Sequence, residues 1–521
     1  MSGSRLRVAT FVLVGAVLAS RVLGFLRDAY IAAAFGANGE TDAFYAAFTI
    51  PDILNYLVAG GTLSITFIPI YTKWLAQDRS DEGDRVFSTI ATLMVSVLTV
   101  GVIVLGIATP AIASRYLHKL RPEDLGLAIH LSRILLPAQI AFYIGGLASA
   151  TLMSRQKFVA ASFAPLLYNL GTIAGGALLG ARFGVAALAW GALVGTLVGP
   201  LGVQVVSAVR HGVRYRPRLD LSHPDVKLWV RLSLPLMIGV SLVTADEWIL
   251  RYFAAGTEGA ISQLSYARKL VWVPIAVAGQ AVGQASMPFF ARLFAEGKRQ
   301  ELAQLVANAA RGSAVVAALA GGALVAVAVP AVDLLFRRGH FDTAQVQPTA
   351  LYVSLFAVAI PLWGLQGIIA RAFYAAGDTL VPMAAGTLVT LLTLPIYVVL
   401  NRSLGTAGLV LGSDLGILLH TASLLVLLPR RLPELDRGRL VVQVLRGFFV
   451  AGLAAAPAYL ASTYLPHGKL VGHALDFVKL FVGGFVFVGV ALAVAGPLGV
   501  TEAGLLMDRV RRRVRRATTK A

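Results

Sequence analysis

Long apolar segments fill this chain, and they constrain its fold more than any other feature. About 14 stretches contain the ~20 predominantly apolar residues that a helix needs to cross a bilayer. They lie near residues 6–34, 42–72, 86–114, 126–152, 158–181, 184–209, 228–254, 262–291, 305–336, 343–374, 380–401, 404–429, 440–465 and 472–508. Because a helix satisfies its own backbone polar groups in lipid, the sequence predicts an all-α integral membrane protein with 14 transmembrane helices by this length criterion.

Composition agrees with this fold and excludes several classes of protein. The 521 residues are 57% hydrophobic and 14% charged, with a mean hydropathy of +0.76, whereas soluble proteins carry about 25% charged residues. The first apolar segment is too long for a cleavable signal peptide. The chain has no cysteine, which excludes disulfides and thiol catalysis. Without a Walker A motif, metal-like histidine spacing or a loop large enough for a catalytic domain, we expect neither an enzyme nor a bound metal or cofactor.

The net charge of +19 could indicate nucleic-acid binding, but the positions of the cations favour a membrane instead. They cluster in alternate loops, near residues 5–7, 73–85, 155–157, 210–231, 292–311, 430–446 and 511–516. The positive-inside rule places these loops, with roughly 30 of the 45 Lys and Arg residues, in the cytoplasm. We therefore expect both termini in the cytoplasm and a basic tail on anionic headgroups. The loop with Arg115, Lys119 and Arg121 departs from this pattern.

The chain repeats itself at an offset of about 220 residues, which predicts two related lobes. The string FGVAALAWG at 183–191 matches LGTAGLVLG at 404–412. The offset covers six spans, an even number, so the lobes share one orientation and relate by a pseudo-twofold axis along the membrane normal. We expect an N-terminal lobe over 1–209, a cytoplasmic linker with an amphipathic segment over 210–231, a C-terminal lobe over 232–429, and a C-terminal helix pair with a basic tail over 430–521. Such repeats place the substrate path between the lobes.

The first apolar segment carries three charged residues, Arg21, Arg27 and Asp28. A charge at the bilayer centre costs roughly 2.5–3.5 kcal/mol on insertion scales, and such residues usually face a bundle interior or a wet cavity. Arg21 and Asp28 share one helical face, so an ion pair that only joins helices is the alternative. We favour a role in binding an anion or the substrate.

Spans 2 and 8 occupy equivalent places in the repeat, and both combine polar residues with helix-breaking proline and glycine. Span 2 contains Asp52 and Asn55, and span 8 contains Arg268 and Lys269. The cations of spans 1 and 8 could face each other across a central cavity, where arginine suits bidentate phosphate binding and lysine acts as a point charge. Snorkelling of Arg268 and Lys269 to the membrane surface is the alternative.

Acidic residues within the spans are candidates for ion coupling or for charge pairing. Asp52 could neutralise a cavity arginine or carry a coupling proton, and the sequence does not choose between the two. Asp246 and Glu247 in span 7 could pair with Arg251 about one turn later, which we favour. Arg133 and Asp414 are further intramembrane charges, for which the sequence indicates no partner.

Four stretches of the sequence carry a resemblance to a known family. They are SRVLGFLRDAYIAAAFGANGETDAFYAAFTIPDIL (20–54), SRQKFVAASFAPLLYN (154–169), FRRGHFD (336–342) and RAFYAAGDTLVP (371–382). In this order, over both lobes, they resemble the MurJ (MviN) family of lipid II flippases, part of the multidrug/oligosaccharidyl-lipid/polysaccharide exporter superfamily. The resemblance implies alternating access through a V-shaped cavity, with spans 13 and 14 forming a groove for the lipid tail.

The resemblance also implies roles for single residues. Arg21, Arg27 and Asp42 match charged positions that the family uses, and Lys269 matches a cavity arginine. Asn55 stands where the family typically has an arginine. The resemblance therefore implies a cavity with less charge than is usual in the family.

We predict a transporter that flips a polyprenyl-pyrophosphate-linked glycolipid, with lipid II of peptidoglycan synthesis as the best candidate, from the cytoplasmic to the outer leaflet. The expected substrate-binding residues are Arg21, Arg27, Asp42, Asn55, Arg268 and Lys269, and the expected coupling or pairing residues are Asp28, Asp52, Asp246 and Glu247. We expect a monomer in the bacterial inner membrane, in contact with membrane lipids and cell-wall synthesis proteins but not nucleic acid.

Three other functions stay open at this point. They are another lipid-linked oligosaccharide flippase of the O-antigen type, a cation-coupled multidrug exporter and a non-transporting membrane scaffold. A drug exporter should favour acidic cavity residues for cationic drugs, whereas the leading cavity charges here are basic.

Overall fold

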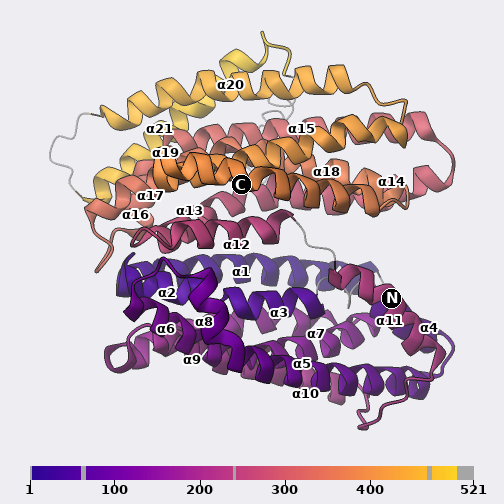
Figure 1. Ribbon diagram of the computed structural model, residues 1–521. Coiled ribbons are helices and arrows are strands. Elements are labelled where there is room, and N and C mark those ends of the chain that lie inside the picture. The colour runs from indigo at the N-terminus through magenta and orange to yellow at the C-terminus, as the bar shows by residue number, and fades with distance from the viewer. Residues whose placement is uncertain (1–2, 60–65, 239–241, 466–471, 501–521) are drawn as a thin grey trace. The chain divides into compact units, whose positions relative to one another are not determined.

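The computed structural model describes residues 3–59, 66–238, 242–465 and 472–500, and every regular element in these ranges is a helix (Figure 1). The prediction of an all-α protein is therefore confirmed. The chain divides into two compact units. The first unit contains residues 1–240, 255–262 and 338–341, and the second contains 241–254, 263–337 and 342–521. The basic tail at 511–516 lies outside the described residues.

The first unit is a bundle of helices, most of which are joined by short turns where the connections are described. Its helices are α1 (Gly3–Phe35), α2 (Gly39–Ala47), α3 (Thr49–Ala59), α4 (Ile68–Ala76), α5 (Ser80–Tyr116), α6 (Pro122–Leu135), α7 (Ala138–Ser154), α8 (Phe158–Phe183), α9 (Ala186–Thr196), the π-helix η2 (Leu197–Val203), α10 (Gln204–Arg210) and α11 (Pro224–Ile238). Helix α1 packs along α8, and α8 packs along α9. Glycines at the α8–α9 contact let the two backbones approach closely, as at many membrane helix interfaces.

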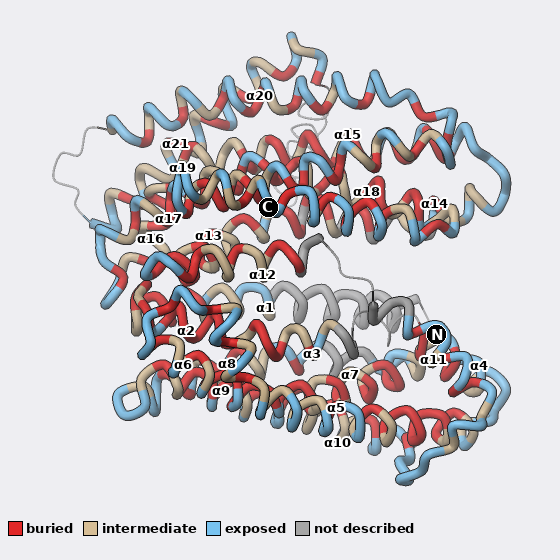
Figure 2. The backbone as a smooth tube through the Cα atoms, viewed as in Figure 1, coloured by how far each residue is buried: buried red, intermediate tan, exposed pale blue. Residues whose placement is uncertain are grey.

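The second unit contains the remaining helices. They are α12 (Leu242–Ala254), α13 (Ala260–Ile275, from residue 263 on), the π-helix η3 (Ala276–Ala281), α14 (Val282–Ala295), α15 (Arg299–Ala326), α16 (Ala328–Phe336), α17 (Thr343–Val358), α18 (Ile360–Ala375), α19 (Leu380–Leu427), the 3-10 helix η4 (Leu428–Arg430), α20 (Arg437–Thr463) and α21 (His473–Ala495). Helix α15 packs against both α18 and α20, and α20 packs against α21. Buried residues line α15 and α18, whereas much of α20 is exposed (Figure 2).

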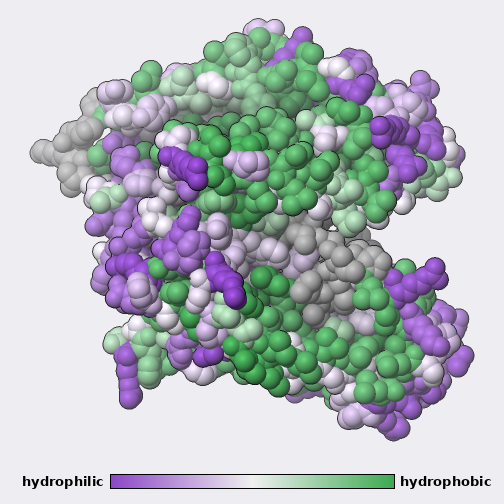
Figure 3. Space-filling view, in the orientation of Figure 1, coloured by the Kyte–Doolittle hydropathy of each residue, from purple (hydrophilic) through white to green (hydrophobic). Residues whose placement is uncertain are grey.

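Each unit shows the surface of a protein that contacts lipid. Hydrophobic side chains dominate its middle, and hydrophilic ones gather at its ends, for example around α4 and α11 (Figure 3). Large apolar side chains that water would disfavour are exposed, among them Leu178 and Phe485 at 80% and 82%. Nine segments of the described residues are long and apolar enough to cross a membrane. This criterion does not reach the count of 14 helices, which stays a prediction.

The internal repeat is visible in the backbone angles. In the first half the residues with positive φ before or between helices include Gly36, Asp78, Gln156 and Gly184, and in the second half they include Gly259, Gly297, Gly377 and Gly405. Each member of the first set has a counterpart about 220 residues later. The match is closest between Gly184 (φ 55°, ψ −142°) and Gly405 (φ 59°, ψ −141°). The two halves therefore turn in the same way at the same places, as the matched strings predict.

A non-helical segment, residues 213–220, lies along the first turns of α5 after α10 has ended. Its backbone N–H groups donate to side chains of α5: Arg214 to Asp84 (3.0 Å), Arg216 to Ser88 (3.1 Å) and Arg218 to Thr92 (3.4 Å). Two residues of extended chain rise about 6.6 Å, close to the ~6 Å of four helical residues. Alternate residues of the segment therefore match every fourth residue of the helix. We call this segment the strap.

Candidate functional site

Two charged residues of α1, Arg27 and Asp28, lie together with residues of α8 in the first unit. The guanidinium of Arg27 donates from Nε and Nη2 to Oδ1 of Asp28, at 2.9 and 2.8 Å, and from Nη1 to Oδ1 of Asn169 at 3.1 Å. It also lies over the ring of Tyr168, 5.9 Å from its centre. The Asn169 amide in turn donates to the carbonyl of Pro165 at 3.1 Å. The position of Arg27 is thus fixed by an acid, an amide and an aromatic ring.

The other predicted residues of α1 and α3 are less enclosed. Arg21 is exposed on α1, and Asn55 is exposed on α3. Asp52 is half-buried and lies within electrostatic range of Tyr168, the ring beside Arg27. The structure therefore places Asp52 near the Arg27 cluster. The sequence alone could not predict this, because it does not show which way α3 faces.

Asp42 sits in a different place, at the start of α2. Its carboxylate oxygen Oδ1 accepts hydrogen bonds from the N–H and the hydroxyl of Ser262, at 2.7 and 2.8 Å. Asp42 is 1% exposed, and its other oxygen has no hydrogen-bond partner among the described residues. Asp42 is thus a buried acceptor that holds residues 255–262 within the first unit, and its part in substrate binding stays a prediction.

Two further contacts hold residues 255–262 and 338–341, which come from the second half of the sequence, within the first unit. Glu258 lies 3.2 Å from the guanidinium of Arg121, which also donates to Asp124 at 2.7 Å. The N–H of His340 donates to the carbonyl of Ala33 at 2.9 Å. Arg121, which departs from the alternating charge pattern, therefore has local acidic partners.

The second unit contains its own buried charge cluster around Asp246 on α12. Its carboxylate accepts hydrogen bonds from the guanidinium of Arg268 and from the hydroxyl of Tyr397. Ser413 donates to it as well, at 3.0 Å. Arg268 also lies 3.8 Å from Glu247. Removing one partner from such a pair leaves a charge without its counter-charge inside the bundle, which is strongly destabilising.

Glu247 contacts Arg251 at 3.9 Å, whereas Asp246 pairs with Arg268 on another helix. The expected pair of Glu247 with Arg251 is thus present, and Asp246 forms an ion pair with a residue of another helix. Asp414 lies within electrostatic range of both Asp246 and Arg268. Asp414 therefore lies near the Asp246 cluster, although the sequence indicated no partner for it.

Lys269, next to Arg268, is half-buried on α13. Trp272, one turn further on, packs its ring against Trp363 of α18, with the ring centres 5.9 Å apart. Arg268 and Lys269 thus belong to the second unit, and Arg21 and Arg27 to the first. Their meeting across one cavity stays a prediction.

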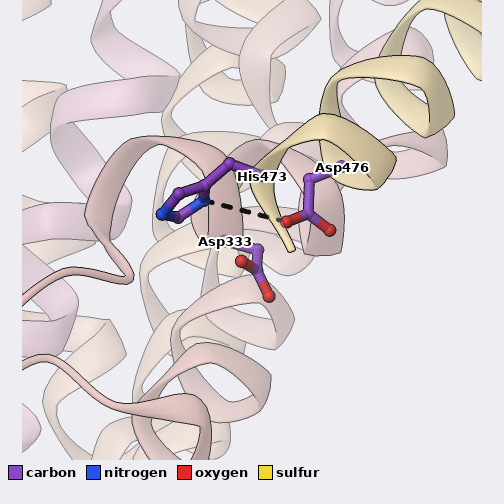
Figure 4. A group of neighbouring side chains, drawn as sticks. All are labelled: Asp333, His473 and Asp476. Atoms are coloured by element: carbon purple, nitrogen blue, oxygen red, sulfur yellow. Dashed lines mark ion pairs between the residues drawn. The ribbon is translucent and has the colours of Figure 1, made fainter. Parts of the chain in front are cut away.

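The second unit contains a further polar cluster, which joins α16 to the start of α21. Asp333, His473 and Asp476 point toward one another (Figure 4), and one ligand atom from each lies within 4.8 Å of the others. Arg337 contacts both carboxylates, at 2.5 Å from Asp333 and 3.3 Å from Asp476. Arg337 offsets one of the two carboxylate charges, and Asp333, Arg337 and Asp476 form an ion-pair network that joins the two helices.

Sequence reasoning identified the charges of these clusters but missed their uncharged partners. Asn169 is the last residue of the stretch 154–169, one of the four that carry the family resemblance. That position was the only indication in the sequence of a role for Asn169. Tyr397 and Ser413 carried no such signal, because their contacts with Asp246 depend on how α12 and α19 pack.

Comparison with known proteins supports the family resemblance. The sequence model of the family described as "Lipid II flippase MurJ" matches residues 31–478. A lipid II flippase MurJ of Burkholderia cenocepacia is 32% identical over 432 residues, covering 80% of this chain and 82% of the relative. A probable lipid II flippase MurJ of Rhizobium meliloti is 26% identical over 519 residues, covering 97% of this chain and 95% of the relative.

Solved structures agree on the fold. A structure of lipid II flippase MurJ in an inward closed conformation superposes with a TM-score of 0.76 at 17% identity, covering 94% of this chain and 99% of the other. An inward-facing multidrug resistance transporter of the MATE family superposes with a TM-score of 0.63 at 16% identity, covering 85% and 96%. Because the family model covers most of the sequence, this chain belongs to the MurJ lipid II flippase family.

Proposed function

We propose that this protein carries lipid II from the cytoplasmic to the outer leaflet of the bacterial inner membrane by alternating access. The observation that carries the proposal is the match of the family model across residues 31–478. The fixed guanidinium of Arg27 adds chemical support, because arginine suits the bidentate recognition of phosphate oxygens. A flippase of this kind moves its substrate without a chemical step, so the protein is a transporter and not an enzyme.

The proposed headgroup site uses cations from both halves. Arg21, Arg27, Arg268 and Lys269 supply positive charge, and Asn55 supplies a neutral hydrogen bond. Since Arg27 is held by Asp28 and Asn169, it presents a fixed donor rather than a flexible one. Arg268 is held in the same manner by Asp246. Each acid offsets the charge of a half-buried arginine when no substrate is bound.

The proposed setting follows from the charge pattern. The arginine-rich ends of the helices lie in the cytoplasm, as do both termini. The two lobes, the linker at 210–231 and the helix pair at 430–521 form the functional parts, and α20 with α21 borders the lipid tail. We further propose that the protein acts as a monomer beside cell-wall synthesis proteins.

A reconstituted flipping assay tests this proposal. Purified protein is placed in vesicles with labelled lipid II, and the label exposed on the outer leaflet is measured over time. We expect transport by the native protein and loss of transport in Arg27→Ala, because the cation that meets the pyrophosphate is gone. Arg182→Ala is the matched control, since Arg182 is an exposed arginine at the end of α8 and contacts only a phenylalanine ring in the described residues.

Complementation gives an independent measurement. The chain is expressed in a strain depleted of its own lipid II flippase, and growth is scored. Rescue by the native chain and by Arg182→Ala, but not by Arg27→Ala, is the expected result. Transport of cationic drugs without any movement of a polyprenyl-pyrophosphate glycolipid would replace this proposal with the drug-exporter function.

A further inference from the structure

An apolar groove lies in the first unit where α11 meets α5 and the chain that follows the strap. It has a volume of about 580 Å³, and its apolar lining residues are Leu93, Leu221, Val226, Val230 and Leu234. Binding sites for small molecules have volumes of about 300–1,000 Å³. The groove is therefore large enough to hold part of a ligand.

Two cations border this groove. Lys227 and Arg231 are the remaining lining residues, and they lie one turn apart on the same face of α11. Both are exposed, and within the described part of the chain neither makes an ion pair. The nearby acid on α11, Asp225, is engaged with Lys73 at 3.3 Å and with the indole of Trp74 at 2.7 Å. The groove thus combines an apolar lining with two positive charges that have no ion-pair partner among the described side chains.

This combination is typical of a site for an anionic lipid. Lysine and arginine can reach the membrane surface merely by snorkelling, with no ligand involved. Snorkelling explains the exposed ends of the side chains, but it does not explain an apolar hollow directly beneath them. Basic pockets between membrane helices on the cytoplasmic side bind the headgroups of anionic lipids. The charge pattern proposed above places this end of α11 on that side.

We propose that the groove binds one anionic glycerophospholipid of the cytoplasmic leaflet. An acyl chain packs against Leu93, Val230 and Leu234, and the phosphate lies between Lys227 and Arg231. The inference rests on the proposed orientation but not on the transported substrate. It would hold for a transporter of any cargo.

The direct test counts lipids bound to the purified full-length protein by native mass spectrometry. The probes are phosphatidylglycerol, phosphatidylcholine and inorganic phosphate. We expect one tightly held phosphatidylglycerol, weaker binding of phosphatidylcholine, and no effect of phosphate alone. The double variant Lys227→Gln/Arg231→Gln should weaken phosphatidylglycerol binding on the order of tenfold or more, given what each cation contributes near an anionic surface.

A matched control removes the same charge elsewhere. Arg437 and Arg439 are exposed at the start of α20, and Arg437→Gln/Arg439→Gln should leave the tightly held lipid in place. Equal losses in both double variants would mean that only overall charge matters, and would overturn the proposal. Unchanged binding in Lys227→Gln/Arg231→Gln would overturn it as well.

A second variant tests the apolar part of the site. Leu221 is 51% exposed, so Leu221→Trp can fill the groove with little effect on folding, which thermal unfolding in lipid-free micelles verifies. We expect this variant to lose the tightly held phosphatidylglycerol although both cations remain. Retention of the lipid, competition by phosphate alone, or displacement by lipid II at stoichiometric amounts would each show that a different ligand or surface is involved. The flipping assay distinguishes a failure here from a failure of the proposed function, because it measures the cargo independently.

Discussion

Asp42 accepts two hydrogen bonds from Ser262, a residue 220 positions later in the chain. That separation is close to the offset of about 220 residues at which the sequence repeats itself. The two residues lie near the starts of α2 (Gly39) and α13 (Ala260), helices that occupy corresponding places in the two halves. A residue at the start of a helix in one half is thus bound directly by a residue at the start of the corresponding helix in the other.

This contact should be measurable in stability. Ser262→Ala removes the hydroxyl donor from a buried carboxylate, and hydrogen bonds to charged groups contribute about 1.5–3 kcal/mol. We expect a lower melting temperature in micelles for this variant. Ser403→Ala is the control, because the hydroxyl of Ser403 is exposed and bonds only within its own helix in the described structure. Equal melting temperatures for the two variants would argue against the contact.

The Asp246–Arg268 pair should show strong coupling. Removing one partner leaves a buried charge, which costs about 3–5 kcal/mol, so Asp246→Asn and Arg268→Gln should each unfold at much lower temperature. The double variant should recover part of the loss, and thermal unfolding of all four proteins gives the coupling energy. If the two single losses simply add, the residues act independently. A stable double variant without transport would indicate that Arg268 also meets the substrate.

Charge at positions 55 and 269 should affect substrate binding in opposite ways. Asn55 is exposed on α3, so Asn55→Arg has room for the longer side chain, should be tolerated, and should strengthen lipid II binding. Lys269→Glu places a negative charge near a pyrophosphate and should abolish binding. Binding of lipid II to the purified variants measures both effects. Normal binding by Lys269→Glu would remove Lys269 from the site.

Gly184 and Gly405 should resist substitution to a similar degree. Both have φ near +60° and ψ near −140°, a region that other residues enter only at a cost of about 1–3 kcal/mol. Gly184→Ala and Gly405→Ala should therefore both lower the melting temperature. Gly452→Ala provides the contrast, since Gly452 lies inside α20 and no atom of the described chain lies within 4 Å of the added methyl group. There alanine favours the helix by about 1 kcal/mol.

The turn before α19 should depend on pH through Asp378. Its pKa lies below the ordinary value, first because the N–H of Val381 donates to the carboxylate, and also because Arg431 does so at 2.8 Å. A lowered pKa means that the charged carboxylate stabilises the fold above its ordinary pKa of about 3.9, and that this stabilisation is lost as the pH falls through the lower folded value. Asp378→Asn should therefore be less stable than the native protein at pH 7.

Melting temperatures across pH 3–7 measure this effect. The difference between native protein and variant should be constant above about pH 5 and shrink in more acidic solution. A difference that is the same at every pH would assign the effect to geometry rather than to charge.

Features that depend on the local backbone were the most predictable from sequence. The turns at Gly184 and Gly405 follow from matched strings, because a positive φ requires a residue that tolerates it. The partners of buried charges were harder. Arg251 was the expected partner of Asp246 and Glu247 because it lies about one turn away. Glu247 does contact it, but the sequence did not indicate that Arg268 on another helix pairs with Asp246. Helix rotation and packing decide such contacts, and a single sequence carries little information about either.

The same limit explains the residues around Arg27. Its charge inside an apolar segment already marked it as a candidate, since such a residue is costly in lipid. That Asn169 would orient its guanidinium depends on how α1 packs on α8. The strap was missed for a different reason, because a loop without regular structure has no periodicity to detect.

The regular pairing of the strap with α5 fixes the length of the connection between the two halves of the sequence. Its donors at Arg214, Arg216 and Arg218 alternate, so an insertion of one residue would direct every later N–H away from α5, whereas an insertion of two would restore the alternation. Length changes here should therefore be accepted in even steps. A reporter or affinity tag between the halves should therefore be inserted after residue 218, beyond the last hydrogen bond from the strap to α5.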